Sequence, residues 1–362
     1  MIRLGNFRGR ASRLWWLAAA ACGLTAGRAA VHDYKPDRYS LTFSSEKPPA
    51  LRIKPGDTVQ TTTVDSEGRD ETGRVVGPKY NALTGPFHIE GAKPGDALVV
   101  YLEQVRLNSQ RGSASTRIGD NAITPREFAK GMAGAKGYFW TIDSAMSPQE
   151  FAKGTAGGKG YYWEYDLERM IGSTKVTPRL SGLRLPLRPF PGCIGVAPAH
   201  EEALSARFAG DHGGNLDYNA LVEGTKLYFP VNVEGALFYF GDGHAAQGDG
   251  ESSGGAVETT LAVRFRVELQ SKQQIPSVRA ESEEFHIAIG VGDPLDRAYQ
   301  RATANMVHWL TQGFGLDRQE AYVLIGTTAQ FDIASIASER GNTVACKIPR
   351  KLLRQVVDPT AP

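Results

Sequence analysis

The residue types best suited to chemistry gather in one run, Gly241-Asp-Gly-His-Ala-Ala-Gln-Gly-Asp-Gly-Glu, directly after an apolar segment. We predict a glycine-rich loop here, and carboxylates and an imidazole on a loop that can approach a ligand closely are what a divalent metal site requires. The alternative is a solvated, turn-rich connection whose polar groups face water. The candidate groups in this run are Asp242, His244, Asp249 and Glu251.

A second polar run, Asp211-His-Gly-Gly-Asn-Leu-Asp, places His212 and Asp217 around two glycines. His212 could ligate a metal or act as a general base. Asp217 could be a ligand, or could orient a ligating histidine from behind. The two runs together indicate a polar site assembled from separate parts of the chain.

The elements that must position these groups are mostly strands. The chain has 362 residues, 41% of them hydrophobic, and its 41 glycines favour tight turns and close backbone approaches over a helical bundle. Strand-forming segments fill 34–110 and 227–269, and two Lys-Pro-Gly-Asp turns, at Lys54 and Lys93, mark equivalent positions in two strand units.

The C-terminal part changes to helical spacing. Apolar residues recur every three or four positions from Leu295 to Leu310, and Gly313 supplies a stop. A second helix begins after Asp317, an N-cap with Glu320 in capping-box spacing. The predicted fold class is therefore mainly β with C-terminal helices (α+β), the helices covering a β core.

The first thirty residues have the composition of a secretory signal peptide. Four arginines precede the apolar run Leu14–Ala21, which is too short to span a bilayer of ~30 Å. Cleavage near Ala29 or Ala30 removes five arginines and lowers the formal charge from +2 to −3. We expect an exported protein, periplasmic or secreted, with no transmembrane anchor after processing. Cys22 offers a second reading, a lipoprotein leader with a lipid anchor.

Charge and cysteine content exclude several classes of protein. With 41 basic against 39 acidic residues and no basic stripe beyond the N-terminus, nucleic acid is not an expected partner. Only Cys193 and Cys346 remain beyond the leader, so a disulfide scaffold is excluded, although these two could pair.

A tandem repeat interrupts the strand-rich sequence. Residues 122–143 match residues 145–166 at 14 of 22 positions, including Glu127-Phe-Ala-Lys-Gly against Glu150-Phe-Ala-Lys-Gly. We interpret 122–166 as a duplicated insertion in one catalytic domain spanning 31–362. It could be an aromatic lid over a pocket, an oligomer contact or a tolerated surface insertion.

Four motifs together resemble the acetamidase/formamidase family in order and spacing, from about Ser40 to Pro349. They are Asn81-Ala-Leu-Thr-Gly-Pro-Phe-His-Ile-Glu-Gly-Ala-Lys-Pro-Gly-Asp, Gly192-Cys-Ile-Gly-Val-Ala-Pro-Ala, His212-Gly-Gly-Asn-Leu-Asp and the run from Gly241 to Glu251. The resemblance implies hydrolysis of the C–N bond of small carboxylic amides by a β-rich homo-oligomer. It also implies a divalent metal, zinc in some relatives, with calcium as the alternative.

Mapped by motif, the resemblance brings Asp65, in Thr63-Val-Asp, to the same pocket as the two polar runs. We predict His212, Asp242 and His244 as metal ligands and Glu251 as the acid/base, with Asp217 and Asp65 as further catalytic residues. A metal-bound water would attack the amide carbonyl while a carboxylate moves the proton.

Three other readings stay open. Glu251-Ser-Ser-Gly-Gly is similar to part of the serine nucleophile loop of amidase-signature enzymes, which would give Ser253 the role of nucleophile. Cys193 is a second candidate nucleophile, although its apolar neighbours suit a buried, inert thiol. The third reading is an exported binding or envelope protein that kept the scaffold without hydrolysis.

Overall fold

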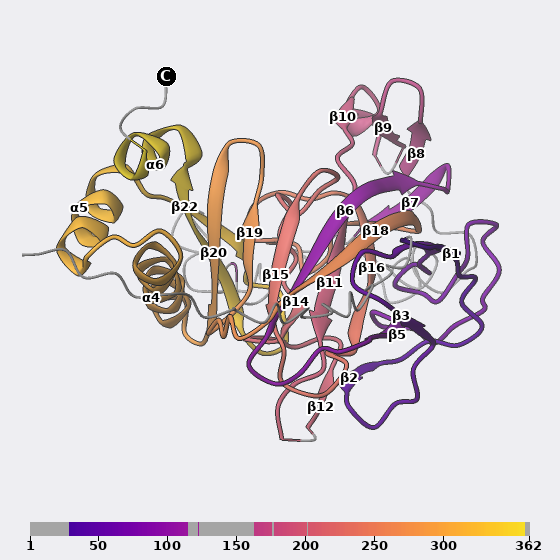
Figure 1. Ribbon diagram of the computed structural model, residues 1–362. Coiled ribbons are helices and arrows are strands. Elements are labelled where there is room, and N and C mark those ends of the chain that lie inside the picture. Colours follow the sequence, from indigo (N-terminus) through magenta and orange to yellow (C-terminus); the bar gives the residue numbers. More distant parts are fainter. Residues whose placement is uncertain (1–28, 115–121, 123–162, 176, 201, 359–362) are drawn as a thin grey trace, which may run out of the picture.

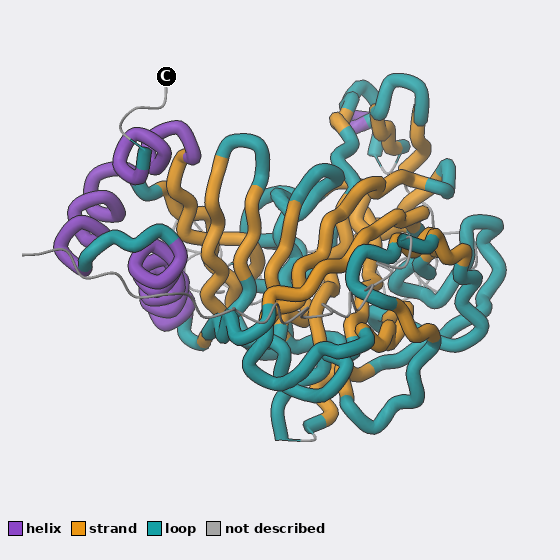
Figure 2. Tube along the Cα trace, in the orientation of Figure 1, coloured by secondary structure: helices purple, strands orange, loops and turns teal. Residues whose placement is uncertain are grey.

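The computed structural model describes residues 29–114, 122, 163–175, 177–200 and 202–358. Two large β-sheets build most of this part of the chain, and the helices gather at the end where the C-terminal strands lie (Figures 1 and 2). The predicted fold class is thereby confirmed. The leader with Cys22, and the repeat except for Ala122 and residues 163–166, lie outside the described residues.

The first sheet has nine strands and a mostly antiparallel ladder. Its order is β1 (Val31–Asp33), β4 (Thr58–Thr62), β18 (Leu261–Gln270), β6 (Ala97–Leu107), β15 (Lys226–Pro230), β19 (Arg279–Glu281), β20 (Phe285–Gly292), β22 (Asn342–Pro349) and β21 (Gln330–Ser335). In β18, buried positions alternate with partly exposed ones, as expected for a strand with one face on the core.

The second sheet has eleven strands and carries most of the polar runs. Its main path is β10 (Leu185–Pro186), β9 (Ile171–Thr174), β8 (Trp163–Asp166), β7 (Arg111–Ala114), β17 (Val257–Thr259), β16 (Phe238–Ala246), β11 (Phe190–Val196), β14 (Gly213–Asn215) and β13 (Ala209–Gly210). Beside this path, β5 (Leu83–Ile89) pairs with β16 and with β3 (Leu51–Ile53), and a separate pair joins β12 (Ala203–Ser205) to β2 (Thr42–Ser44).

Aromatic side chains from both sheets meet in the core between them. Phe240 of β16 and Phe87 of β5 contact Phe265 of β18 edge-on, with ring centroids 5.5 and 5.2 Å apart. Such contacts add to the stabilisation that comes from burying the rings. Strand β16 thus anchors the second sheet to the first before it reaches its polar residues.

The helices of the described residues are α4 (Leu295–Gly313), α5 (Arg318–Thr328) and α6 (Arg350–Val357), with a short 3₁₀ turn η1 (Pro178–Leu180) elsewhere. α4 packs on β20 and β22, where a side chain at Gly290 would overlap the backbone of Ala302. The predicted capping box of α5 is confirmed: Asp317 and Glu320 exchange backbone-to-carboxylate hydrogen bonds of 2.8 Å. α6 was not predicted. Among the described residues, no helix has the length and apolar character to cross a bilayer.

The prediction that Asp242 and His244 lie on a loop is wrong, because β16 continues through Ala246. Its glycines signal close strand packing rather than a turn. A Cβ at Gly241 would meet the carbonyl oxygen of Ala82, and one at Gly243 would lie 2.7 Å from the carbonyl oxygen of Thr259. The neighbouring strands therefore exclude side chains at these two positions.

Candidate functional site

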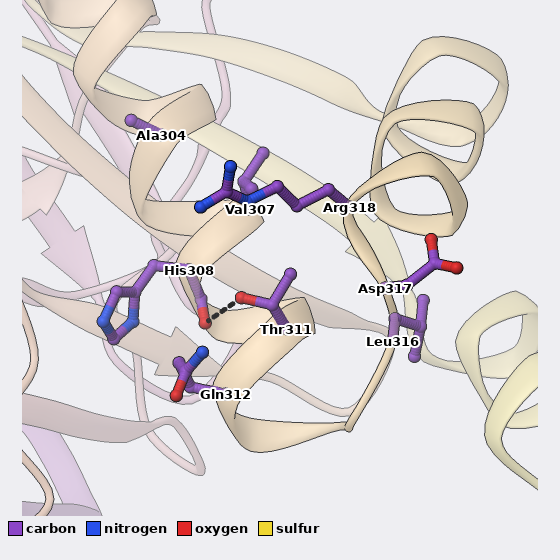
Figure 3. Close-up of a pocket in the computed structure, with 8 residues that line it drawn as sticks. All are labelled: Ala304, Val307, His308, Thr311, Gln312, Leu316, Asp317 and Arg318. Carbon is purple, nitrogen blue, oxygen red and sulfur yellow. Dashed lines mark hydrogen bonds between the residues drawn. The ribbon is translucent and has the colours of Figure 1, made fainter.

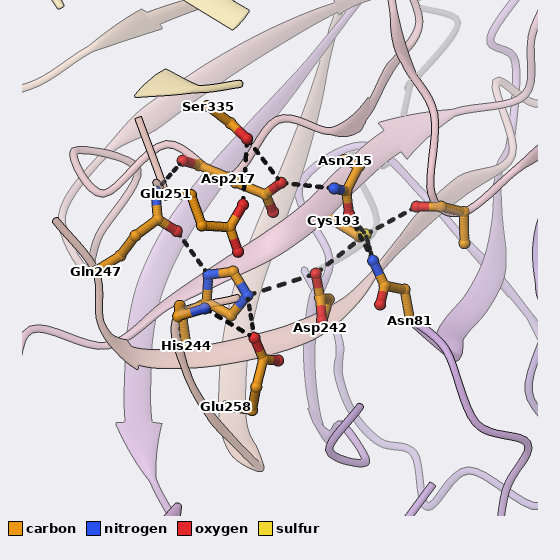
Figure 4. A network of polar contacts seen from close by, with 12 residues as sticks. Asn81, Cys193, Asn215, Asp217, Asp242, His244, Gln247, Glu251, Glu258 and Ser335 are labelled. Carbon is orange, nitrogen blue, oxygen red and sulfur yellow. Dashed lines mark hydrogen bonds and ion pairs between the residues drawn. The ribbon is translucent and has the colours of Figure 1, made fainter. Parts of the chain in front are cut away.

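The candidate site centres on His244, whose side chain is buried. Figure 4 shows the carboxylates and the Gln247 amide that lie around its imidazole. Its Nε2 lies 3.5 Å from Asp242 Oδ2 and 3.6 Å from Glu258 Oε1. Asp217 and Glu251 lie beside the same imidazole. Potential ligand atoms of Asp217, His244 and Glu251 fall within 4.8 Å of one another, as do those of Asp242, His244 and Glu258.

Three of the site's carboxylates stand on backbone in the left-handed region. The φ angles are 43° at Asp217, 56° at Asp242 and 49° at Glu251. For residues other than glycine this conformation is uncommon, and it persists only where the surroundings hold it. Such strain at three convergent acids is typical of a functional site.

Polar neighbours hold two of these acids. The Asn215 amide donates to Asp217 Oδ2 at 2.5 Å and also contacts Ser338. The Ser335 hydroxyl lies 3.3 Å from the same Asp217 oxygen and 3.2 Å from Glu251 Oε2, so it bridges the two acids. β21 of the first sheet, which ends at Ser335, thereby joins a site built mainly on the second sheet.

Gln247 fixes the orientation of the His244 ring. Its Nε2 donates to the backbone oxygens of Asp217, at 2.5 Å, and of Ala334, at 3.2 Å. Its Oε1 consequently faces His244 Nδ1 at 3.0 Å and accepts a hydrogen bond from it. In the neutral imidazole the proton then resides on Nδ1, and the Nε2 lone pair points toward Asp242 and Glu258.

Gly192 of β11 leaves a cradle between the candidate ligands. A Cβ at Gly192 would lie 2.6 Å from His244 Cε1, 2.7 Å from Asp217 Oδ1 and 2.8 Å from Asp242 Oδ2. Asp217 Oδ1 is buried and has no hydrogen-bond partner among the described residues. An orphaned carboxylate oxygen in a cradle without a side chain fits a bound cation.

The electrostatics of the site also favour a bound cation. Burial raises the pKa of Asp217 well above its usual value, raises that of Glu251, and brings that of Glu258 to about 8. Burial opposes protonation of His244, but the charges of Glu258 and Asp242 raise its pKa well above 6.5. No described lysine or arginine forms an ion pair with these carboxylates, so a divalent cation would supply the missing positive charge.

A cavity of about 310 Å³ leads to this cluster. Asp242, Glu251 and Glu258 line its buried end. Tyr80 and Arg207 line its exposed rim. This volume is at the lower end of the range for small-molecule pockets. Another hollow, of about 430 Å³ between α4 and α5, contains no such convergence of acids (Figure 3).

The structure does not bring every predicted residue to the cluster. His212 is buried against Phe43, with ring centroids 5.1 Å apart, and belongs to neither ligand group. Burial lowers its pKa to about 4, so it is neutral. Asp65 accepts backbone N–H groups of Glu67 and Arg69, at 3.0 and 2.8 Å, which shapes a turn at the cavity wall. Asp249 accepts from Asn219 at 2.8 Å at the surface.

Glu258, Ser335 and Gly192 were not predicted as site residues. Glu258 is an acid between Val257 and Thr259 on the short strand β17. A charged residue within such a strand segment was the signal available in the sequence. Ser335 and Gly192 carry no such signal, because their roles arise from packing between distant segments. Gln247 lay inside the polar run, and only the structure shows that it orients His244.

The two candidate nucleophiles lie in unfavourable settings. Cys193 is fully buried, and its thiol contacts Asn215 Oδ1 at 2.8 Å and Asp242 Oδ2 at 3.5 Å. Burial and the charges of Asp242 and Asp217 raise its pKa well above 9, so the reactive thiolate is disfavoured. Ser253 donates to the backbone oxygen of Gly255 at 2.7 Å. Cys193 and Cys346 do not pair; both are free.

The chain is similar in sequence and fold to several known proteins. A predicted acetamidase/formamidase from Thermoanaerobacter tengcongensis superposes with a TM-score of 0.68 and 26% identity, covering 90% of this chain and 98% of that one. An acetamidase from Yersinia enterocolitica gives a TM-score of 0.70 and 26% identity, covering 91% and 96%. A protein of Schizosaccharomyces pombe named as a formamidase is 26% identical over 61% of this chain.

The chain spans less than two thirds of the length of the curated relatives it matches, with 62% for the S. pombe protein. The profile of the Acetamidase/Formamidase family, in contrast, matches residues 39–208 and 203–355, which is most of the chain. These two ranges contain every residue of the buried cluster around His244. The protein therefore belongs to the acetamidase/formamidase family.

Proposed function

We propose that this protein hydrolyses the C–N bond of a small carboxylic amide, of the formamide or acetamide type, to an acid and ammonia. The observation that carries the proposal is the convergence of four carboxylates on His244 at the closed end of a cavity. Family membership and the names of the relatives support the same reaction class.

Asp217, Asp242 and His244 would hold a divalent cation beside Gly192, with zinc as the first candidate and calcium as the second. Either cation held there would polarise the amide carbonyl, and zinc would also lower the pKa of a bound water toward ~7. The donor set is rich in oxygen, which suits both of these cations. His212, predicted as a ligand, is left out of this set because it packs on Phe43.

Glu251 is the acid/base in this proposal. It lines the cavity, and burial raises the pKa of its carboxyl, which favours a group that takes a proton from water and passes it to the departing nitrogen. Ser335 contacts Glu251 Oε2 and would keep the carboxyl turned toward Asp217. Gln247, which accepts a hydrogen bond from Nδ1 of His244, would keep that ring oriented.

The deciding experiment measures ammonia release from formamide, acetamide, propionamide and a small lactam by the chain without its leader, with metal content determined on the same sample. Activity lost with a chelator and restored by one metal supports the proposal. Bound metal without turnover would favour a binding or envelope protein on the same scaffold. Turnover without metal would return attention to Ser253 and Cys193.

Two further expectations remain proposals of their own. The first is export to the periplasm or the exterior, which the arginines and the apolar run at the start of the sequence support. A lipid anchor at Cys22 is the alternative. Assembly into a homo-oligomer is supported by exposed apolar side chains on α5 and α6. These are Tyr322, Val323, Leu352, Val356 and Val357.

A further inference from the structure

The two Lys-Pro-Gly-Asp turns use their aspartates in the same way. In each turn the aspartate Oδ2 accepts the backbone N–H of the lysine that opens it, at 2.9 Å for both Asp57 and Asp96. The other oxygen, Oδ1, accepts a backbone N–H from a distant segment at 2.8 Å: Lys272 for Asp96, and Ala30 for Asp57. Each turn therefore clamps another stretch of chain, and Asp57 clamps the residue just before β1.

Asp57 is well prepared to receive a positive charge. It is buried, and its Oδ2 also lies 2.9 Å from His32 Nε2. Burial opposes ionisation, but hydrogen bonds from Lys54, Ala30 and His32 hold the pKa of Asp57 below its usual value. Ala30 itself is exposed, and its carbonyl oxygen accepts from Thr58 N at 2.9 Å at the start of the parallel pairing of β1 with β4.

The sequence before Ala30 reads Gly27-Arg28-Ala29, with small residues at the first and third positions. Signal peptidases cut after such a pattern. A cut after Ala30 would instead place Arg28 at the first of these positions, where a small residue is required. Of the two bonds next to β1, after Ala29 and after Ala30, only the first follows this pattern, and its cleavage frees the nitrogen that contacts Asp57.

We propose that the chain is matured by hydrolysis of the peptide bond between Ala29 and Ala30, and that the new α-amino group of Ala30 forms an ion pair with Asp57. Water supplies a hydroxyl to the Ala29 carbonyl carbon and a proton to the Ala30 nitrogen, so the leader leaves with a carboxylate and the mature chain gains an amine. This maturation is independent of the amide hydrolysis proposed above.

The geometry makes the new terminus an anchor. The protonated amine keeps its contact with Asp57 Oδ1 and now makes it with a full charge, which strengthens the hydrogen bond. Because Ala30 is exposed, the remaining N–H groups of the amine still reach water and are not left unpaired. The ion pair would hold β1 on the outer edge of the nine-stranded sheet.

The first test expresses the full chain in a host with a secretory pathway and measures the intact mass and N-terminal sequence of the exported product. The expected product begins at Ala30. An uncut chain, a lipidated chain beginning at Cys22, or any other first residue would overturn the proposal.

The second test compares two chains by thermal unfolding, one beginning at Ala30 and one at Gly27, in which the Ala30 nitrogen stays a neutral amide. The chain beginning at Ala30 should unfold about 2 °C higher. In Asp57→Asn this difference should vanish, whereas Asp96→Asn should destabilise both chains and leave the difference intact, because Asp96 binds no terminus.

Selective acetylation of the α-amino group in the chain beginning at Ala30 gives the same answer without a substitution, and it should lower the unfolding temperature to that of the longer chain. An unchanged temperature after acetylation, or a difference between the two chains that persists in Asp57→Asn, would refute the ion pair.

Discussion

At the scale of single residues, the site combines buried charge with backbone strain. Asp217, Asp242 and Glu251 each pay of order 1 kcal/mol or more for a left-handed backbone, and their carboxylates are crowded around one imidazole. Neither arrangement helps the chain to fold, so both must be held by packing and hydrogen bonds such as those of Asn215 and Ser335.

Glu251→Gln should keep the bound metal and lose roughly 10²–10⁴-fold in turnover, because the amide cannot exchange a proton. Asp249→Asn is the matched control in the same run, since that carboxylate lies at the surface and contacts Asn219. Ammonia release and metal content measured on the three proteins check this. Turnover within a few-fold of wild type in Glu251→Gln would remove Glu251 from the role.

Gly192→Ala should abolish metal binding and lower stability, because the new methyl group would lie within 2.8 Å of His244, Asp217 and Asp242, which are buried and would have to shift. Gly248→Ala is the control, since a Cβ there meets nothing within 4 Å. Metal content by mass spectrometry is the readout. Stoichiometric metal in Gly192→Ala would place the cation elsewhere.

Cys193→Ala should retain turnover within about tenfold of wild type, since the thiol is buried and its pKa is raised. The loss that remains reflects the contact between Sγ and Asp242. A fall of several orders of magnitude, together with reaction of the wild-type thiol with a substrate analogue, would restore the cysteine nucleophile.

At the scale of elements, the sequence predicted α4, α5 and the strands within 34–110 and 227–269, but it missed α6 and misplaced the centre of the site. Leu295–Leu310 and the capping box at Asp317 follow local rules, so their prediction succeeded. The prediction of a loop at Asp242 and His244, which lie on β16, was wrong because glycine occurs both in turns and where strands pack closely. Gly241 and Gly243 resemble a turn in the sequence, whereas in the structure they admit neighbouring strands. Only tertiary contacts distinguish a glycine in a turn from a glycine that lets two strands approach closely.

For the residues of the site, too, local motifs predict one part and only tertiary contacts show the rest. Local motifs located Asp217, Asp242, His244 and Glu251, which the structure brings together. His212 lies against Phe43 and outside both ligand groups, and a histidine between a strand and two glycines looks the same in the sequence whether it faces a metal or an aromatic ring.

Two glycines in different surroundings, one where β20 packs on α4 and one on the exposed side of α5, should respond in opposite ways to substitution by alanine. Gly290→Ala should destabilise the fold by about 2 kcal/mol or more, because the methyl group would overlap the backbone of α4 at Ala302. Gly326→Ala, on the exposed side of α5, should stabilise it by up to about 1 kcal/mol through helix propensity. Urea unfolding of both variants measures this, and equal effects would contradict it.

At the scale of the whole molecule, the buried acids link stability to pH and to metal. Burial raises the pKa of Glu258 to about 8, and the pKa values of Asp217 and Glu251 are also raised. An acid with a higher pKa in the folded state keeps a proton that the unfolded chain has released, so stability falls as pH rises through the folded pKa. The raised pKa of His244 acts in the same direction.

The metal-free protein should therefore have a lower unfolding temperature at pH 9 than at pH 7. His212 and His286, whose pKa values burial lowers to about 4, are neutral in the folded state and mostly neutral in the unfolded chain over this window, so their contribution is small. A saturating divalent cation should reduce the difference, because it favours the ionised carboxylates. Thermal unfolding at both pH values, with chelator and with metal, checks this. If the unfolding temperature fell by the same amount between pH 7 and pH 9 with chelator and with metal, these acids would not be the groups that bind the metal.

The pairing of β7 with β8 has an evolutionary consequence. Gly112 lies opposite Trp163 in this ladder, so the two ends of the intervening chain are fixed side by side. By general polymer theory, doubling the number of residues between two fixed ends costs only about 0.6 kcal/mol in loop-closure entropy. A lineage could thus gain or lose a copy of the 23-residue unit without rebuilding the sheet. Because Ser113 and Ala114 line the cavity, each such event would occur next to the site where selection on the substrate acts.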